Sequence, residues 1–169
     1  KMRVPRSTVE RVRGMWTPSF VRRVKEELKR RGIVAITVFD REYPEYLKEI
    51  AQPPWVLYIK GEPSLLSETC FAVVGTRKPT QYGKRVARRM GAEIASLGWV
   101  VVSGMAAGID ADAHRGALEA NGKTIAVLGT GVDVVYPKHL RSLYEELVQK
   151  GAVCSEMPPG TTPHPGLFP

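Results

Sequence analysis

The chain has few cysteines and no long apolar run, the features that mark disulfide-rich, metal-binding and membrane proteins. Cys70 and Cys154 are its only cysteines, and neither has the C-x-x-C or histidine spacing of a zinc or redox centre. We therefore expect two buried, reduced thiols, no bound metal and a cytoplasmic location. No apolar run comes near the roughly 20 residues that cross a bilayer, so we expect no membrane segment.

Acidic residues are scarce in one part of the chain only. The 169 residues carry a formal net charge of +8. Residues 1–31 contain eleven basic and three acidic side chains, whereas residues 32–169 contain fourteen of each. A basic composition favours nucleic acid as a partner, but the excess belongs entirely to the first segment. Because charge runs are usually solvated faces, this segment adds at most a non-specific attraction for phosphate.

Short apolar segments alternate with amphipathic ones from residue 70 onward. The pattern predicts strands at 70–74, 99–102, 124–128 and 152–155, with helices at 81–97, 110–120 and 138–149. This alternation predicts an α/β fold with a doubly wound parallel sheet, of the extended Rossmann-like kind. In the first helix we expect Val86, Met90, Ile94 and Leu97 to form the buried face.

The preceding residues are expected to form two smaller parts. Residues 1–31 form a basic segment that is irregular until a helix at 19–31. Residues 32–69 form a small accessory α/β layer, with strands at 33–39 and 55–59 and with Tyr43, Trp55 and Tyr58 in its core. Residues 70–169 form the Rossmann-like domain. Because four strands make a thin sheet of this type, we expect the natural protein to continue past Pro169.

Two turns at the ends of expected strands have the composition of phosphate-binding loops. They read Val73-Val74-Gly75-Thr76-Arg77 and Ser103-Gly104-Met105-Ala106-Ala107-Gly108. Glycine lets backbone N–H groups at a helix N-terminus approach an anion closely. We expect Gly75, Thr76, Ser103, Gly104 and Gly108 to donate to phosphate oxygens. The carboxyl ends of parallel strands meet at one edge, so the turns predict a phosphate-binding crevice there.

Four side chains near this crevice have expected roles. Arg77 has the planar donor fork that suits bidentate contact with phosphate, and Lys78 is its expected helper; the alternative is two solvated cations. Asp110 is expected to cap the following helix, and His114, one turn later, to hydrogen-bond Asp110 and support the loop. A structural role for His114 is favoured over a catalytic one.

A fifth candidate is Lys138, at the start of the last predicted helix. The helix dipole disfavours a lysine there, and a nearby phosphate would compensate for it. A flexible, exposed lysine is the alternative. Single-strand binders also stack bases on aromatic rings, for which Tyr136, His139 and Phe168 are candidates.

From about Gly32 to Pro169, a series of motifs occurs in one order. They are Tyr43-Pro44 and Leu47; Pro53-Pro54, Leu57-Tyr58 and Lys60-Gly61; Val73-Val74-Gly75-Thr76-Arg77 and Tyr82-Gly83; Ser103-Gly104, Ala106, Gly108-Ile109-Asp110 and Ala113-His114; Gly122 and Thr124-Ile125-Ala126-Val127; Gly131, Asp133 and Tyr136-Pro137; Gly151 and Ser155-Glu156. In these motifs the chain closely resembles the DNA-processing protein A family (DprA, or Smf). The family's Arg-Asn-Arg motif after Phe-Pro and most of its N-terminal helical domain are not present here.

The resemblance implies a function. Members of this bacterial family bind single-stranded DNA, protect it and load the RecA recombinase onto it in natural transformation and recombination. The family places a DNA-binding arginine at the position of Arg77 and a DNA-contacting lysine at that of Lys138. It also implies a homodimer formed through the doubly wound domain.

Enzymatic alternatives find less support in the residues. No nucleophile–base pair or metal-ligand set is evident, so we expect no catalysis and no cofactor. The main alternative is a phosphoribohydrolase-like, nucleotide-binding enzyme of the same fold group. Its Pro-Gly-Gly-x-Gly-Thr-x-x-Glu motif is absent, and the nearest segment, 129–133, has no suitable glutamate. A dinucleotide oxidoreductase is less favoured still, because Val134 stands where the third glycine of its fingerprint is needed.

Overall fold

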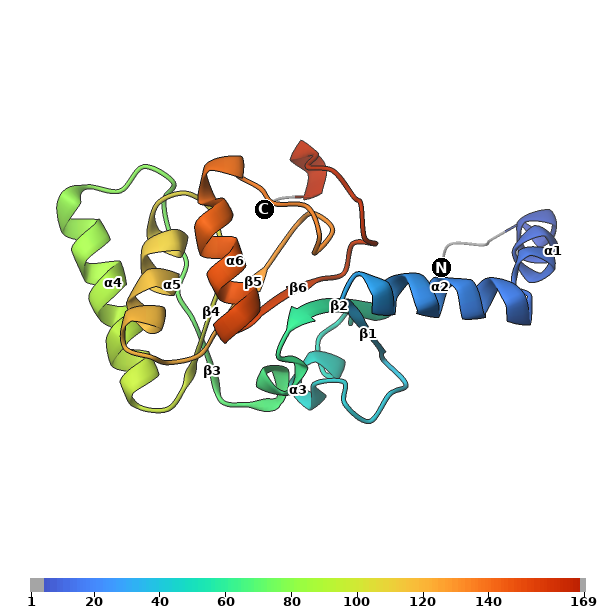
Figure 1. Ribbon diagram of the computed structural model, residues 1–169, viewed down its shortest axis with the longest axis horizontal. Coiled ribbons are helices and arrows are strands. Elements are labelled where there is room, and N and C mark those ends of the chain that lie inside the picture. Colours follow the sequence, from blue (N-terminus) through green and yellow to red (C-terminus); the bar gives the residue numbers. More distant parts are fainter. Residues whose placement is uncertain (1–4, 168–169) are drawn as a thin grey trace. The chain divides into compact units, whose positions relative to one another are not determined.

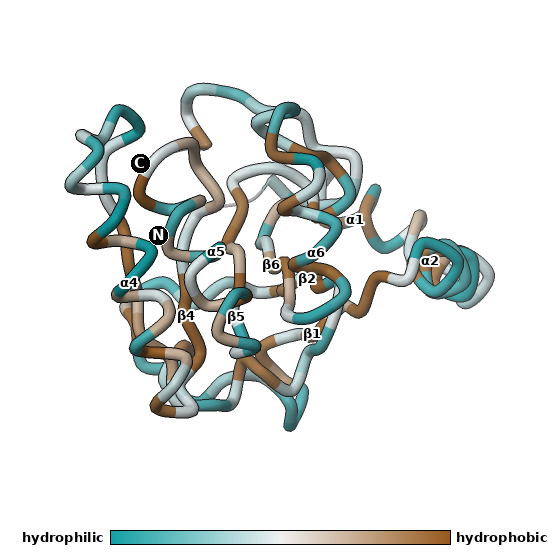
Figure 2. The backbone as a smooth tube through the Cα atoms, turned by 60° about the vertical axis from the view of Figure 1, so that its left-hand side comes forward, coloured by the Kyte–Doolittle hydropathy of each residue, from teal (hydrophilic) through white to brown (hydrophobic). Residues whose placement is uncertain are grey.

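The computed structural model describes residues 5–167, and the chain divides into two compact units, Lys1–Ile33 and Val34–Pro169. The first unit contains helices α1 (Arg6–Met15) and α2 (Pro18–Arg30). Thr17 caps α2, as its side chain accepts a hydrogen bond from the Phe20 N–H. The expected irregular start was wrong, because α1 begins directly after Pro5 and no proline interrupts it. Figure 2 shows that α2 is largely hydrophilic.

The second unit is built on one six-stranded sheet, in the order β1-β2-β6-β5-β4-β3 (Figure 1). Its strands are β1 (Val34–Thr37), β2 (Val56–Gly61), β3 (Cys70–Ala72), β4 (Val100–Ser103), β5 (Thr124–Val127) and β6 (Ala152–Ser155). The last four are parallel, which confirms the predicted α/β, Rossmann-like class. β2 pairs antiparallel with β6, so the strands of the expected accessory layer extend the main sheet.

Three helices connect the parallel strands. They are α4 (Gln81–Ser96), α5 (Ile109–Glu119) and α6 (Arg141–Lys150), the last preceded by the short helix η2 (Lys138–Leu140). The strand order advances one place at each connection, so right-handed crossovers put all three helices on the same face (Figure 1). Val101 of β4 packs on this side with residues of α4 and α5.

The opposite face of the sheet is covered by the segment between β1 and β3. This segment contains α3 (Glu45–Lys48) and the 3-10 helix η1 (Pro63–Ser67). Val100, Ile125 and Cys154 form a core there with Tyr43 and Leu65. The alternation of side chains along β4 therefore places Val100 and Val101 in different cores.

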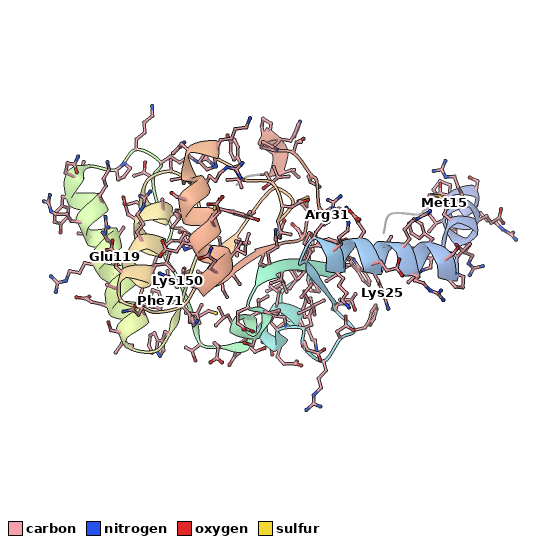
Figure 3. The ribbon with its side chains drawn as sticks, in the orientation of Figure 1. Met15, Lys25, Arg31, Phe71, Glu119 and Lys150 are labelled. Carbon is pink, nitrogen blue, oxygen red and sulfur yellow. The ribbon has the colours of Figure 1, made fainter. Side chains whose placement is uncertain are left out.

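The predicted buried face of α4 was partly wrong. Met90 and Leu97 are 40% and 67% exposed, and Ala87, Gly91, Ile94 and Ala95 are buried instead. The reason is close helix packing: a Cβ at Gly91 would overlap the Ala113 carbonyl oxygen of α5. Small residues thus form the contact, and the larger apolar side chains lie beside it. Arg88 of α4 also pairs with Glu119 of α5, which Figure 3 labels.

Two further expectations about buried residues were wrong. Tyr43 is buried and its hydroxyl donates to the Pro54 carbonyl oxygen at 2.8 Å, but Trp55 is 74% exposed and lies beside Phe39. Cys154 is buried, and burial raises the pKa of its thiol to about 12. Cys70 is exposed because β3 pairs with a neighbour on one side only. Among the helices of residues 5–167, none is long and apolar enough to cross a membrane.

Candidate nucleic-acid interface

The loops that follow β3, β4 and β5 lie at the same edge of the sheet, the upper side of the second unit in Figure 1. A groove of about 1300 Å³ opens beside them. Arg77, Gly104 and Gly129 line it at the strand ends, and Ile125 and Val127 line it on the sheet face away from the crossover helices. The predicted crevice therefore continues into an apolar groove.

The loop after β3 has exposed hydrogen-bond donors. In the described part of the chain, no hydrogen bond engages the backbone N–H groups of Gly75 and Thr76. The Thr76 hydroxyl accepts from the Lys78 N–H at 3.2 Å, and the Ile109 N–H donates to the Thr76 carbonyl oxygen at 3.2 Å. The loop is thus tied to α5 through the Thr76 carbonyl group, while the N–H groups of the exposed residues Gly75 and Thr76 have no partner in the described chain.

Two glycines permit this close approach between the loop and α5. A Cβ at Gly75 would lie 2.8 Å from Cγ1 of Ile109. Gly108, the residue before α5, has a φ of +93°, and a Cβ there would lie 2.8 Å from Cδ of Pro79. Both glycines are therefore required by loop geometry. A contact between Gly75 or Gly108 and phosphate stays a prediction.

Arg77 and Lys78 are exposed at the end of this loop. Within residues 5–167, neither forms an ion pair with a carboxylate. Arg77 also lines the groove. An exposed guanidinium without a partner has all its donors available to an anionic ligand.

In the loop after β4, the Ser103 and Gly104 donors expected to bind phosphate are engaged within the chain. The Ser103 hydroxyl is buried and donates to the Val73 carbonyl oxygen at 2.6 Å. The N–H groups of Gly104 and Ala106 donate to Oδ2 of Asp110, at 3.1 Å and 3.4 Å. The Asp110 carboxylate thus takes the place of an external anion, and the residue before α5 is Gly108, not Asp110. These donors are used within the chain because Asp110 folds back over the loop.

The expected hydrogen bond between His114 and Asp110 does not form. His114 is fully buried, and its Nδ1 lies 2.6 Å from the Thr124 hydroxyl oxygen on β5. That hydroxyl donates to the Val101 carbonyl oxygen, so His114 Nδ1 must be the donor to Thr124. Burial lowers the pKa of His114 to about 3 and keeps the ring neutral. His114 therefore joins α5 to the sheet, which is a structural role.

Lys138 lies at the same edge, beyond the end of β5. It is exposed and forms no ion pair in the described residues. β5 is two strands from β3, which corresponds to roughly 10 Å across the sheet. Tyr136 is 45% exposed and His139 is exposed, whereas Phe168 lies outside the described residues.

The sequence reasoning missed Tyr82 and Thr124. Tyr82, in the first turn of α4, is 70% exposed and follows Arg77 by five residues. Its position in a Tyr-Gly motif beside basic residues was the available signal. No sequence signal pointed to Thr124, because its hydrogen-bond partner His114 lies on another element. Among residues 5–167, no three His, Cys, Asp or Glu side chains group as metal ligands.

With this geometry established, comparison with known proteins identifies the family. Residues 34–169 match the model of the DNA recombination-mediator protein A family. The chain belongs to this family. It is 43% identical to the Smf protein of Synechocystis over 148 residues, which cover 85% of this chain and 37% of that protein. It is 40% identical to DprA of Bacillus subtilis over 148 residues, which cover 87% of this chain and 50% of that protein.

Solved structures of family members agree with the fold. DprA of Streptococcus pneumoniae superimposes with a TM-score of 0.77 at 33% identity, covering 98% of this chain and 61% of that one. DprA of Helicobacter pylori, whose structure describes its single-stranded DNA binding mode, gives a TM-score of 0.71 at 32% identity. That match covers 79% of this chain and 60% of the other. The chain thus spans half or less of the two curated relatives above.

Proposed function

We propose that this chain is a non-enzymatic module that binds single-stranded DNA at the carboxyl edge of its parallel strands. Arg77 contacts one phosphate bidentately, Lys78 and Lys138 neutralise neighbouring phosphates, and the N–H groups of Gly75 and Thr76 donate to phosphate oxygens. The observation that carries the proposal is Arg77 itself. It is exposed, lines the groove and has no carboxylate partner within residues 5–167.

The proposal extends to the role of the whole protein. We infer that it protects DNA in the cytoplasm, transfers it to the RecA recombinase and works as a homodimer. Membership of the DNA recombination-mediator family supports this role. The single-stranded DNA binding of the Helicobacter pylori relative supports the choice of ligand.

Substitution of Arg77 tests the proposed site. We expect Arg77→Ala to weaken binding of a labelled oligo-dT by about 10- to 100-fold, because a charge-assisted hydrogen-bond pair to phosphate is lost. Lys138→Ala should lower the salt slope of log K by about 0.7, the value for one lost single-strand phosphate contact. Fluorescence anisotropy across a salt series measures both effects.

Lys150→Ala is the matched control. Lys150 lies at the end of α6, at the opposite edge of the sheet (Figure 3), where it pairs with Glu146. Its loss should leave oligo-dT binding within about twofold, because exposed ion pairs contribute little. Equal binding to duplex and single strand, unchanged by Arg77→Ala, would contradict the proposal and favour a site in residues 1–31. A rise in melting temperature with micromolar AMP would instead favour a nucleotide-binding enzyme.

A further inference from the structure

The first turns of α4 carry a strongly basic surface next to the proposed DNA site. Residues 69–92 hold six of the fourteen basic residues found after residue 31, and they contain no Asp or Glu. Residues 32–169 as a whole are neutral by formal charge. Basic charge is therefore concentrated locally, in residues 77–89, which run from the Arg77 loop into α4.

Among the six basic residues of this segment, only the two that lie furthest from the Arg77 loop, Arg88 and Arg89, form ion pairs with carboxylates of residues 5–167. Arg88 pairs with Glu119, and Arg89 pairs with Glu93 at 2.7 Å. In the described chain, Lys84 and Arg85 have no carboxylate partner, as is also true of Arg77 and Lys78. The unpaired cations are thus the ones nearest the strand-end site.

An exposed aromatic ring lies among these cations. Tyr82 is 70% exposed, and no described hydrogen bond or ring contact engages its side chain. Arg85 follows three residues later, so the two side chains are neighbours on one helix face. The neighbouring residue Gly83 faces α5, because a Cβ built on it would lie 3.4 Å from Pro79 and 3.7 Å from Ile109, the first residue of α5. Tyr82 and Arg85 therefore share the face that is turned from α5.

We propose that Tyr82 and Arg85 form a second subsite, which binds the nucleotides that continue from the Arg77 site along α4. An exposed ring offers a stacking surface that suits any base, and an unpaired cation beside it suits the phosphodiester. Continuity with Arg77 and Lys78, together with the charge, makes a single strand the occupant. This inference rests on the proposed function, because the second subsite would bind a further part of the same single-stranded DNA.

The length of the oligonucleotide separates the two subsites. We expect Tyr82→Ala to weaken binding of a 16-nucleotide oligo-dT by about tenfold, the effect of losing one stacked base. The same substitution should change binding of a 4-nucleotide oligo-dT less than twofold. Tyr82→Phe should match the unsubstituted chain, since it keeps the ring. Arg85→Gln should lower the salt slope for the longer strand by about 0.7.

Arg89→Gln/Glu93→Gln is the matched control. It removes a cation one turn further along the same face together with its partner, so the net charge is unchanged. It should leave both oligonucleotides bound as before. If Arg77→Ala weakens binding while Tyr82→Ala and Arg85→Gln do not, the second subsite is refuted and the proposed function stands. If the unsubstituted chain shows no salt-sensitive binding of single strands, the proposed function fails and the subsite fails with it.

Discussion

Lowering the pH from 8 to 5 is expected to reduce the free energy of unfolding by about 2 kcal/mol through His114 alone. In the folded chain the buried ring has a pKa of about 3, against an ordinary value of 6.5. Below pH 6.5 the unfolded chain binds a proton that the folded chain does not bind. Stability therefore falls with pH throughout the window from 6.5 to about 3.

Urea unfolding at pH 8, 6 and 5 measures this effect. His114→Gln keeps a side-chain N–H donor for Thr124 but removes the titrating ring, so its stability should change much less over this range. His139→Gln is the control, because His139 is exposed, and it should keep the full pH dependence. Equal pH slopes for His114→Gln and the unsubstituted chain would show that another group is responsible. Hydrogen bonds from Arg30 and Arg31 lower the pKa of Glu27 to about 2, so in the folded chain this carboxylate titrates below the range.

Gly91→Ala is expected to lower the free energy of unfolding by about 2–3 kcal/mol, the cost of overpacking a close contact. A Cβ at this position would overlap the Ala113 carbonyl oxygen and would lie 3.0 Å from the carbonyl carbon. The clash is with backbone, so a side-chain rotation cannot relieve it. α4 and α5 would have to separate, and the Arg77 loop would move with the start of α4. Gly116→Ala should behave similarly, because its Cβ would overlap the Arg88 carbonyl oxygen.

Gly83→Ala is the control for this substitution. It lies in the same helix, but its Cβ would meet neighbours at 3.4 Å or more, which is ordinary contact. Since alanine favours a helix over glycine by up to about 1 kcal/mol, Gly83→Ala should be neutral or stabilising. Thermal and urea unfolding of the three variants gives the comparison. A Gly91→Ala variant as stable as Gly83→Ala would contradict the close packing described above.

Most elements of the second unit could be predicted from local patterns. Apolar runs such as 124–128 alternate with amphipathic segments bounded by Gly98, Gly122 and Gly151, and the observed β5, α4 and α6 lie within a few residues of their expected bounds. Periodicity and capping act over a few residues, so one sequence can reveal them. The position of Arg77 in the loop after β3 follows from the same patterns.

The contacts between helices and strands could not be predicted from such local patterns. The face that α4 buries depends on how closely α5 approaches, so Gly91 is buried in place of the larger Met90. Likewise, β2 joins the main sheet through β6, a strand almost a hundred residues later in the chain. The spacing of apolar residues along one helix shows which side is less polar, but it says nothing about the shape of the neighbouring helix.

At the candidate site, the sequence by itself determined the chemistry that is present: glycine-containing turns at strand ends, with Arg77, Lys78 and Lys138 beside them. Only the tertiary structure decided which of these groups are available to a ligand. Asp110 takes up the N–H groups of Gly104 and Ala106, whereas those of Gly75 and Thr76 stay open. The physical reason is that a hydrogen-bond donor serves one strong acceptor at a time. Which acceptor it meets depends on how the folded chain is arranged around the loop, and here the Asp110 side chain turns back to residues only four and six positions before it.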